Sequence, residues 1–174
     1  ELIVRDLARD PVPHLDAQRF AAITTQPQER TPEQRTAVAH SDALIDELRR
    51  ADVIVLGLPF YNFGVPSTLK AYFDHIARAG VTFRYTEKGP EGLLEGKRVH
   101  VFATRGGRYV GTPLDTQTAY VRDFLAFVGL SDIQFVYAEG LGISEASRQI
   151  ALDEARAAVD DLVRATTRSE REAA

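Results

Sequence analysis

The sequence contains no cysteine and no methionine. Without cysteine, neither a disulfide framework nor a cysteine-ligated zinc site can form. Methionine is missing even at position 1, where Glu1 stands, although a natural protein begins with this residue. Composition alone does not decide whether the natural protein begins upstream of Glu1.

The sequence also lacks a surplus of positive charge and any long apolar run. Its 21 basic and 25 acidic residues give a net charge of −4, whereas nucleic-acid binding needs a basic excess that neutralises phosphates. No stretch approaches the ~20 apolar residues that cross a bilayer. Residues 1–6 do not resemble a signal peptide, because charges flank only three apolar residues. We expect a soluble cytoplasmic protein that binds neither nucleic acid nor membranes.

What the sequence does contain is typical of one globular domain. Of its 174 residues, 44% are hydrophobic and 26% are charged. A domain has ~150 residues, and a chain of this length buries roughly 70% of its unfolded surface. We therefore predict a single domain over residues 1–174.

Strands and helices are predicted to alternate along this domain. Apolar runs predict strands at residues 2–4, 53–58, 99–104 and 133–138, and the second run is expected to be buried on both faces. Apolar residues at helical spacing predict helices at 32–50, from Leu69 to a stop at Gly80, at 114–128, and after Ser144. Thr31 and Gln34 have the spacing of a capping box at the start of the first of these helices. The inner face of the last helix is expected to carry Ile150, Ala155, Val159, Leu162 and Val163. Residues 10–31 are expected to be irregular, and residues 81–96 to form a small hairpin.

This alternation predicts an α/β fold, a doubly wound parallel sheet with helices on both faces. Ligands bind such sheets beyond the carboxyl ends of the strands, which directs attention to loops 59–66, 104–113 and 138–143. The first loop holds three aromatic residues and Asn62, which either frame a planar ligand or simply cap the core. The second holds Gly106 and Gly107, whose backbone could cradle a ligand or only form a turn. The third begins like a dinucleotide fingerprint, but Glu145 replaces its last glycine, so we interpret it as a turn leading into a helix.

Other chemistries find little support. The four histidines show no metal-binding spacing, so no metal site is expected. Neither a nucleophile elbow nor a phosphate-binding loop with its lysine is present.

Several motifs together resemble one known family, the FMN-dependent NADH-azoreductases. They are Leu58-Pro59-Phe60-Tyr61-Asn62-Phe63, the run Arg-Ala-Gly-Val-Thr-Phe-Arg-Tyr-Thr at 78–86, Gly-Pro-Glu-Gly at 89–92, and Thr104-Arg105-Gly106-Gly107. The resemblance extends from about Val4 to the last helix. It implies a flavodoxin-like sheet with strand order 2-1-3-4-5, and a homodimeric reductase of quinones and azo compounds.

The resemblance also implies a site for FMN. One edge of the isoalloxazine would be lined by Phe60, Tyr61, Asn62 and Phe63, with Asn62 and the adjacent backbone near N5. The pyrimidine end would be held by Thr104, Arg105, Gly106 and Gly107. Tyr85 and Phe127 would shape the substrate pocket at the dimer interface. Family members more often have methionine in place of Phe60, which should alter packing only, and the role of Tyr109 is open.

The main departure from the family is at the start of the chain. Members have a strand and a serine-containing loop before the segment that matches residues 2–7, and that loop holds the FMN phosphate. The missing strand would lie between residues 2–4 and 53–58, where unpaired backbone groups cost ~1–3 kcal/mol each. We therefore expect the natural protein to extend N-terminally by ~35 residues, the size of a βα unit. A purified protein with a mass near 19.3 kDa would contradict this.

The implied function is a two-step redox cycle. NADH or NADPH would give a hydride to the flavin and leave, and a quinone or aromatic azo compound would then take two electrons. Because the flavin carries this chemistry, no catalytic side chain is expected. Two alternatives stay open: a hydrolase of the acyl-carrier-protein phosphodiesterase type, a name that some members carry, and a cofactor-free fragment or interaction module.

Overall fold

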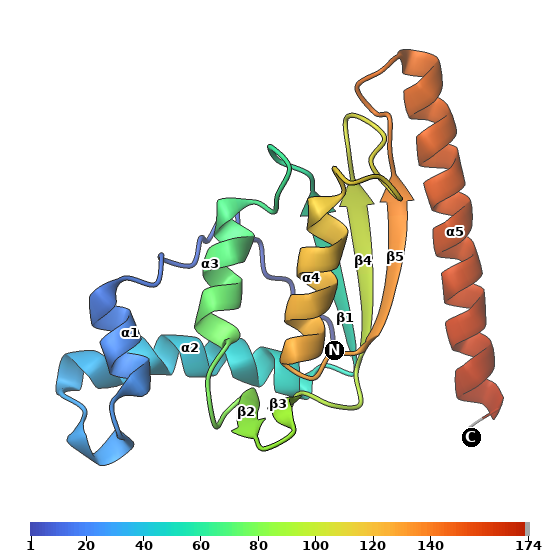
Figure 1. Ribbon diagram of the computed structural model, residues 1–174. Coiled ribbons are helices and arrows are strands. Elements are labelled where there is room, and N and C mark those ends of the chain that lie inside the picture. The colour runs from blue at the N-terminus through green and yellow to red at the C-terminus, as the bar shows by residue number, and fades with distance from the viewer. Residues whose placement is uncertain (173–174) are drawn as a thin grey trace.

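A parallel sheet of three strands forms the centre of the molecule (Figure 1). The computed structural model describes the backbone of residues 1–172 and the side chains of residues 1–166. The strands are β1 (Val53–Pro59), β4 (Arg98–Thr104) and β5 (Asp132–Ala138), in the spatial order β1-β4-β5. All three point the same way, so their carboxyl ends and the loops that follow meet at one edge.

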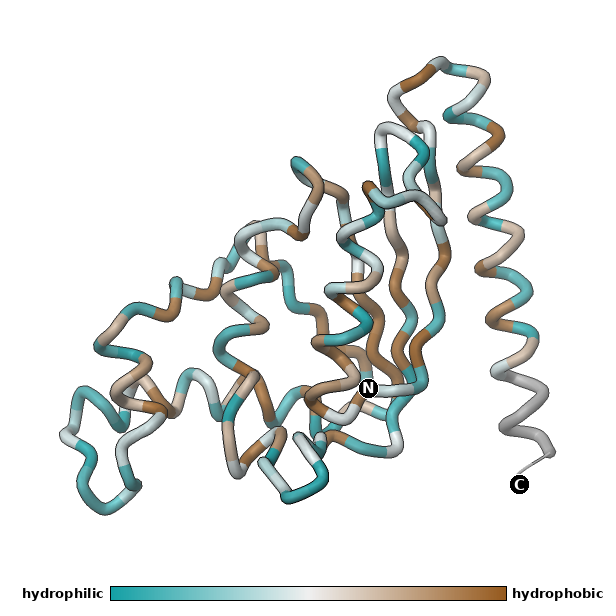
Figure 2. Tube along the Cα trace, in the orientation of Figure 1, coloured by the Kyte–Doolittle hydropathy of each residue, from teal (hydrophilic) through white to brown (hydrophobic). Residues whose placement is uncertain are grey.

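One face of the sheet forms the hydrophobic core. Side chains alternate between the two faces of a strand, and register places Ile54, Leu56 and Leu58 of β1 beside Val99, Val101 and Ala103 of β4 on this core face. The helices on this side are α2 (Pro32–Arg50), α3 (Ser67–Ile76) and α4 (Thr116–Phe127). Figure 2 shows the hydrophobic residues gathered along the strands.

The last helix, α5 (Glu145–Glu172), lies along the opposite face beside β5 (Figure 1). Its start agrees with the sequence, because the Ser144 hydroxyl accepts a hydrogen bond from the Ser147 N–H at 3.1 Å. The predicted inner face is partly wrong. Ile150 and Val163 are both 55% exposed, because the stripe that meets the sheet runs through Ala151, Leu152, Ala155, Val159 and Leu162.

The start of α2 confirms the helix signal seen in the sequence. The Thr31 hydroxyl accepts a hydrogen bond from the Gln34 N–H at 3.3 Å, and the Gln34 side chain accepts one from the Thr31 N–H at 3.0 Å. This reciprocal capping box satisfies two backbone donors that the first turn of a helix otherwise leaves unpaired.

A small antiparallel hairpin formed by β2 (Phe83–Thr86) and β3 (Gly89–Gly92) confirms the predicted excursion. The chain that leaves it is bonded to the end of α4, because the Leu93 and Leu94 N–H groups both donate to the Val128 carbonyl. Backbone meets backbone here: a Cβ added to Gly92 would lie 2.0 Å from the nitrogen of Gly129. The hairpin is therefore fixed to the carboxyl end of α4.

The first thirty residues differ from the prediction. Residues 2–4 form no strand, and the side chain of Leu2 is 86% exposed, because no strand of the described chain pairs with this segment. Residues 10–31 are less irregular than expected. They contain α1 (Ala17–Thr24), capped by the Asp16 carboxylate, and a short 3-10 helix, η1 (Pro27–Glu29).

The expectation that residues 53–58 are buried on both faces was also wrong. β1 is an edge strand of the described sheet, and α5 covers only the far side of the second face. Val55 is consequently 63% exposed. None of the helices in the described part of the chain combines the length and the apolar character needed to cross a membrane.

Candidate functional site

The loop that follows β1 is a tight turn with unusual backbone angles. Tyr61 and Gly64 exchange two backbone hydrogen bonds, of 3.2 and 2.9 Å, across Asn62 and Phe63. The φ angles of Asn62 and Phe63 are +48° and +64°, the combination that a type I′ turn requires. Asparagine tolerates this region and phenylalanine rarely does, so the turn holds backbone strain of the kind that gathers at functional sites.

The loop that follows β4 is extended by the loop that follows β5. The N–H groups of Gly140, Leu141 and Gly142 donate to the carbonyls of Gly107, Arg105 and Gly106, at 2.8, 3.1 and 2.9 Å. These bonds fix the glycine-containing backbone although no regular strand pairing continues there. The third loop therefore supports the second one, a role that its sequence did not predict.

Three aromatic rings connect the first and second loops. The centroid of the Tyr109 ring lies 4.8 Å from that of Phe60 and 5.9 Å from that of Phe63. The Tyr109 ring also covers Gly107, where a Cβ would lie 2.7 Å from the Tyr109 hydroxyl. Tyr109 thus packs between the two loops, while Tyr61 is exposed.

Arg105 is buried, with 1% of its surface exposed. Its guanidinium donates to Asp115 at 2.8 Å, to the Thr118 hydroxyl at 2.8 Å and to Glu139 at 3.1 Å. Burial opposes ionisation of Asp115, but hydrogen bonds from Arg105 and Thr118 outweigh it and lower the pKa of that carboxyl. The Arg105 side chain therefore turns into the protein, and only its backbone belongs to the loop surface.

Two further side chains shape these loops and were missed in the sequence. Gln117 of α4 donates to the carbonyls of Pro59 and Gly64, at 2.9 and 3.0 Å. The Glu139 carboxylate accepts from the N–H of Tyr109 at 2.8 Å. The pairing of Asp115 with Thr118 at the start of α4 is a visible capping signal, whereas no local pattern marks Gln117 or Glu139.

The arrangement leaves several backbone donors free. Within the described part of the chain, no hydrogen bond is made by the N–H groups of Asn62, Phe63, Gly106 and Gly107. Thr104, where β4 ends, is exposed beside them. A Cβ added to Gly106 would meet nothing within 4 Å. Free donors next to open space can bind a ligand that carries acceptors along its edge.

The other two predicted residues, Tyr85 and Phe127, lie elsewhere. They gather around Phe83, whose ring centroid is 5.4 Å from that of Tyr85 and 4.2 Å from that of Phe127. Tyr85 is 75% exposed. The hairpin that carries it lies at the opposite end of the sheet from the loops (Figure 1).

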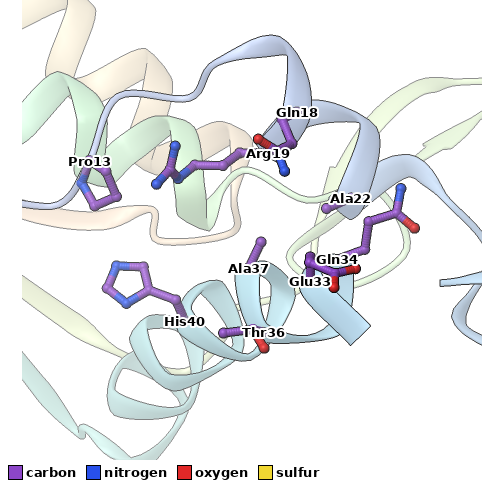
Figure 3. Close-up of a pocket in the computed structure, with 9 residues that line it drawn as sticks. All are labelled: Pro13, Gln18, Arg19, Ala22, Glu33, Gln34, Thr36, Ala37 and His40. Carbon is purple, nitrogen blue, oxygen red and sulfur yellow. The ribbon is translucent and has the colours of Figure 1, made fainter. Parts of the chain in front are cut away.

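Two other features of the described chain, a cavity and a histidine, lie away from these loops. The cavity of about 390 Å³ between α1 and α2, lined in part by Arg19 and His40, contains none of the predicted residues (Figure 3). The His75 ring contacts the Pro13 carbonyl at 3.0 Å. Among the described residues, no group of three acidic or histidine side chains could hold a metal ion.

Comparison with known proteins identifies the family. A family profile described as a flavodoxin-like fold matches residues 1–163. The chain is 57% identical over 159 residues to FMN-dependent NADH:quinone oxidoreductase 6 of Burkholderia lata, covering 91% of this chain and 80% of that protein. The chain belongs to the FMN-dependent NADH:quinone oxidoreductase family. The resemblance and the fold class drawn from the sequence are thereby confirmed.

Two further proteins are similar to the chain over most of its length. The FMN-dependent NADH:quinone oxidoreductase of Cellvibrio japonicus is 58% identical over 151 residues, which is 87% of this chain and 76% of that one. Among solved structures, the FMN-dependent NADH-azoreductase of Bacillus anthracis in complex with FMN superposes with a TM-score of 0.78 at 30% identity. That match covers 91% of this chain and 79% of the azoreductase.

Proposed function

We propose that the chain is an FMN-dependent oxidoreductase that passes electrons from NADH or NADPH to quinones and to aromatic azo compounds in a two-step cycle. The observation that carries the proposal is the meeting of the Tyr61–Gly64 turn with the Gly106–Gly107 loop, both rich in free backbone donors. The names and the FMN complex of the family members agree with it.

The residues present fit a flavin. The isoalloxazine is a flat ring system with nitrogen and oxygen acceptors along one edge, and free N–H groups beside open space at Gly106 match such an edge. When bound, FMN supplies the two-electron chemistry, as hydride acceptor in one half of the cycle and as donor in the other. The protein's contribution is to bind and orient it.

Each loop has a distinct part in this arrangement. The residues proposed to line one edge of the ring are Phe60, Tyr61, Asn62 and Phe63, and those proposed to hold its pyrimidine end are Thr104, Arg105, Gly106 and Gly107. Because the Arg105 guanidinium is buried, we assign its contribution to the backbone and to the shape of the loop. Tyr109 covers Gly107 and so narrows the approach from that side.

The substrate pocket is proposed to need a second copy of the chain. Phe127 lies eleven positions after Thr116, which stands at the loop end of α4, and this corresponds to about 16 Å along the helix axis. Tyr85 and Phe127 therefore cannot lie over the loops of their own chain. They can line the pocket of a partner in a homodimer, where Tyr85, exposed here, would be covered.

We propose that the protein acts in the cytoplasm. The function is tested on the purified chain. FMN is added, its binding is followed by quenching of flavin fluorescence, and NADH is then supplied without oxygen. Bleaching of the flavin absorbance, followed by its return when a benzoquinone is added, is the expected result. A chain that ignores FMN, or whose bound flavin NADH does not bleach, would contradict the proposal, and activity on an azo dye tests that acceptor separately.

A further inference from the structure

Gln117 spans the loop that follows β1 from behind. Its side chain is completely buried, and its Nε2 donates to the carbonyl of Pro59 at 2.9 Å and to that of Gly64 at 3.0 Å. A primary amide has two N–H bonds, so each hydrogen serves one carbonyl. The two contacts tie together the residue where β1 ends and the residue where the turn closes.

The turn has few other supports. The side chains of Tyr61 and Phe63 are 59% and 53% exposed, and Asn62 and Phe63 both hold positive φ angles. Apart from its two internal bonds and the one donated by Gln117, the only hydrogen bond to this turn within the described part of the chain comes from the Thr116 hydroxyl of α4, which donates to the Phe63 carbonyl. Besides the contacts of the Phe63 ring with Phe60 and Tyr109, Gln117 and Thr116 therefore link this strained backbone to the rigid part of the fold.

The same turn of helix holds the second loop. Asp115, directly before α4, accepts a hydrogen bond from Arg105 at 2.8 Å, and Thr118 accepts another at 2.8 Å. Residues 115–118 thus contact both loops, so one turn of helix, together with the direct contacts between the loops, sets the separation between them.

The amide has an energetic cost that packing alone does not explain. The Oε1 of Gln117 is buried and has no hydrogen-bond partner in the described part of the chain. A buried acceptor without a partner is destabilising, whereas an apolar side chain of similar shape at the same place would avoid that cost. The two bonds donated by Nε2 are what the amide provides in return.

We propose that Gln117 is a positioning residue that sets where the isoalloxazine ring lies between the two loops. By fixing Pro59 and Gly64, it fixes the free N–H groups of Asn62 and Phe63 relative to those of Gly106 and Gly107. This inference rests on the proposed function, because it assumes that a flavin binds these groups.

The test compares variants of the full chain with riboflavin and FMN as probes, since riboflavin has the isoalloxazine but no phosphate. Q117L removes both hydrogen bonds that the amide donates. T116V removes the hydrogen bond from the Thr116 hydroxyl to the Phe63 carbonyl, and because Thr116 is exposed, this substitution should leave the protein folded. The matched control is Q26L, at an exposed glutamine beside η1 whose side chain caps nothing. Thermal unfolding shows that each variant folds.

We expect Q117L to weaken the binding of both flavins about tenfold and to shift the visible absorbance band of the bound flavin. We expect T116V to weaken binding about threefold, and Q26L to match the wild type. Because the contact is to the ring, the factor should be the same for riboflavin and FMN.

Q117E provides a readout that a purely structural role would not change. Its carboxylate would face two carbonyl oxygens and donate nothing, but its protonated form can donate one bond, and burial favours protonation. Flavin binding by Q117E should therefore recover, relative to wild type, as the pH is lowered.

Folded Q117L and T116V that bind flavin like wild type, with an unshifted spectrum, would overturn the assignment of Gln117 while leaving the proposed function intact. A wild-type chain that binds neither flavin would overturn both. The two failures are thus separated by the wild-type titration.

Discussion

The guanidinium carbon of Arg105 lies over the Phe60 ring, 5.1 Å from its centroid. The Tyr137 ring stands 5.0 Å from the same carbon, so a buried cation is held between two aromatic rings as well as between two carboxylates. Contacts of this kind stabilise a desolvated cation. The ring of Phe60, the first aromatic residue of the loop after β1, therefore packs on the buried Arg105 guanidinium.

Replacing Arg105 should therefore act first on stability. R105L leaves the partly buried carboxylates of Asp115 and Glu139 without their cation, which should lower the free energy of unfolding by about 3 kcal/mol. Urea denaturation measures this change in the free energy of unfolding. The control is R108L, because Arg108 is exposed and its one side-chain bond is 3.5 Å long; it should change stability by less than about 0.5 kcal/mol. Equal losses in the two variants would contradict the buried role.

The turn can be tested at Asn62. N62G keeps the positive φ of +48° accessible and should bind FMN within about threefold of wild type if backbone donors make the contact. N62A must adopt the same φ at a cost of about 1–2 kcal/mol and should bind about tenfold more weakly. Titration by fluorescence quenching distinguishes them. If both variants lose binding equally, the Asn62 side chain, rather than the turn, contacts the flavin.

His75 should make the fold sensitive to acid. Burial, together with the nearby charges of His40 and Arg19, lowers its pKa below the ordinary 6.5 and outweighs the bond to Pro13. The unfolded chain therefore takes up this proton first as the pH falls, so the stability is complete above about pH 6.5 and declines below it. H75Q, which retains a donor but does not titrate, should lose less stability between about pH 7 and about pH 5. Parallel stability–pH curves for the two proteins would exclude the effect.

The junction of the hairpin with α4 should not tolerate a side chain. G92A places a Cβ 2.0 Å from the Gly129 nitrogen, and relieving that overlap should cost about 1–3 kcal/mol. G57A adds a Cβ that meets nothing within 4 Å and is the matched control, expected within about 0.5 kcal/mol of wild type. Thermal unfolding of both variants tests this, and an unchanged melting temperature for G92A would disprove the close approach.

Tyr85 and Tyr61 are expected to act by shape. Y85F and Y61F retain the rings and should keep turnover with NADH and a quinone near the wild-type rate, whereas Y85A should raise KM for the quinone. Steady-state kinetics distinguish the two outcomes. A large fall in kcat for either phenylalanine variant would instead assign its hydroxyl a part in proton delivery.

The sequence predicted well those structural features that depend on residues close together in the chain. The Thr31–Gln34 capping box, the hairpin within residues 81–96 and the position of Ser144 all follow from chemistry within a few residues. The cap at Asp16 is equally local, but the surrounding prolines concealed it.

Features that depend on distant partners were not predictable. Arg105 reads as a loop residue, and its burial results from Asp115, ten residues away, and Glu139, thirty-four residues away. The alternation in β1 is equally non-local, because Val55 is apolar and yet exposed where no helix of the described chain covers it. Gln117 lies among polar residues, so nothing nearby distinguishes a buried amide from a surface one.

Because the hairpin is attached at Gly92 and Gly129, α4 connects the loops at its first turn with the hairpin at its last turn. In the proposed function, its first turn would support the loops that hold FMN in the same chain, and its last turn would carry the aromatic cluster that covers the partner's pocket in the homodimer. A displacement of Tyr85 by substrate bound in the partner's pocket would then be transmitted along about 16 Å of α4 to the cofactor site of its own chain. The two active sites of such a dimer would be coupled, so that substrate bound at one site would change the turnover rate at the other.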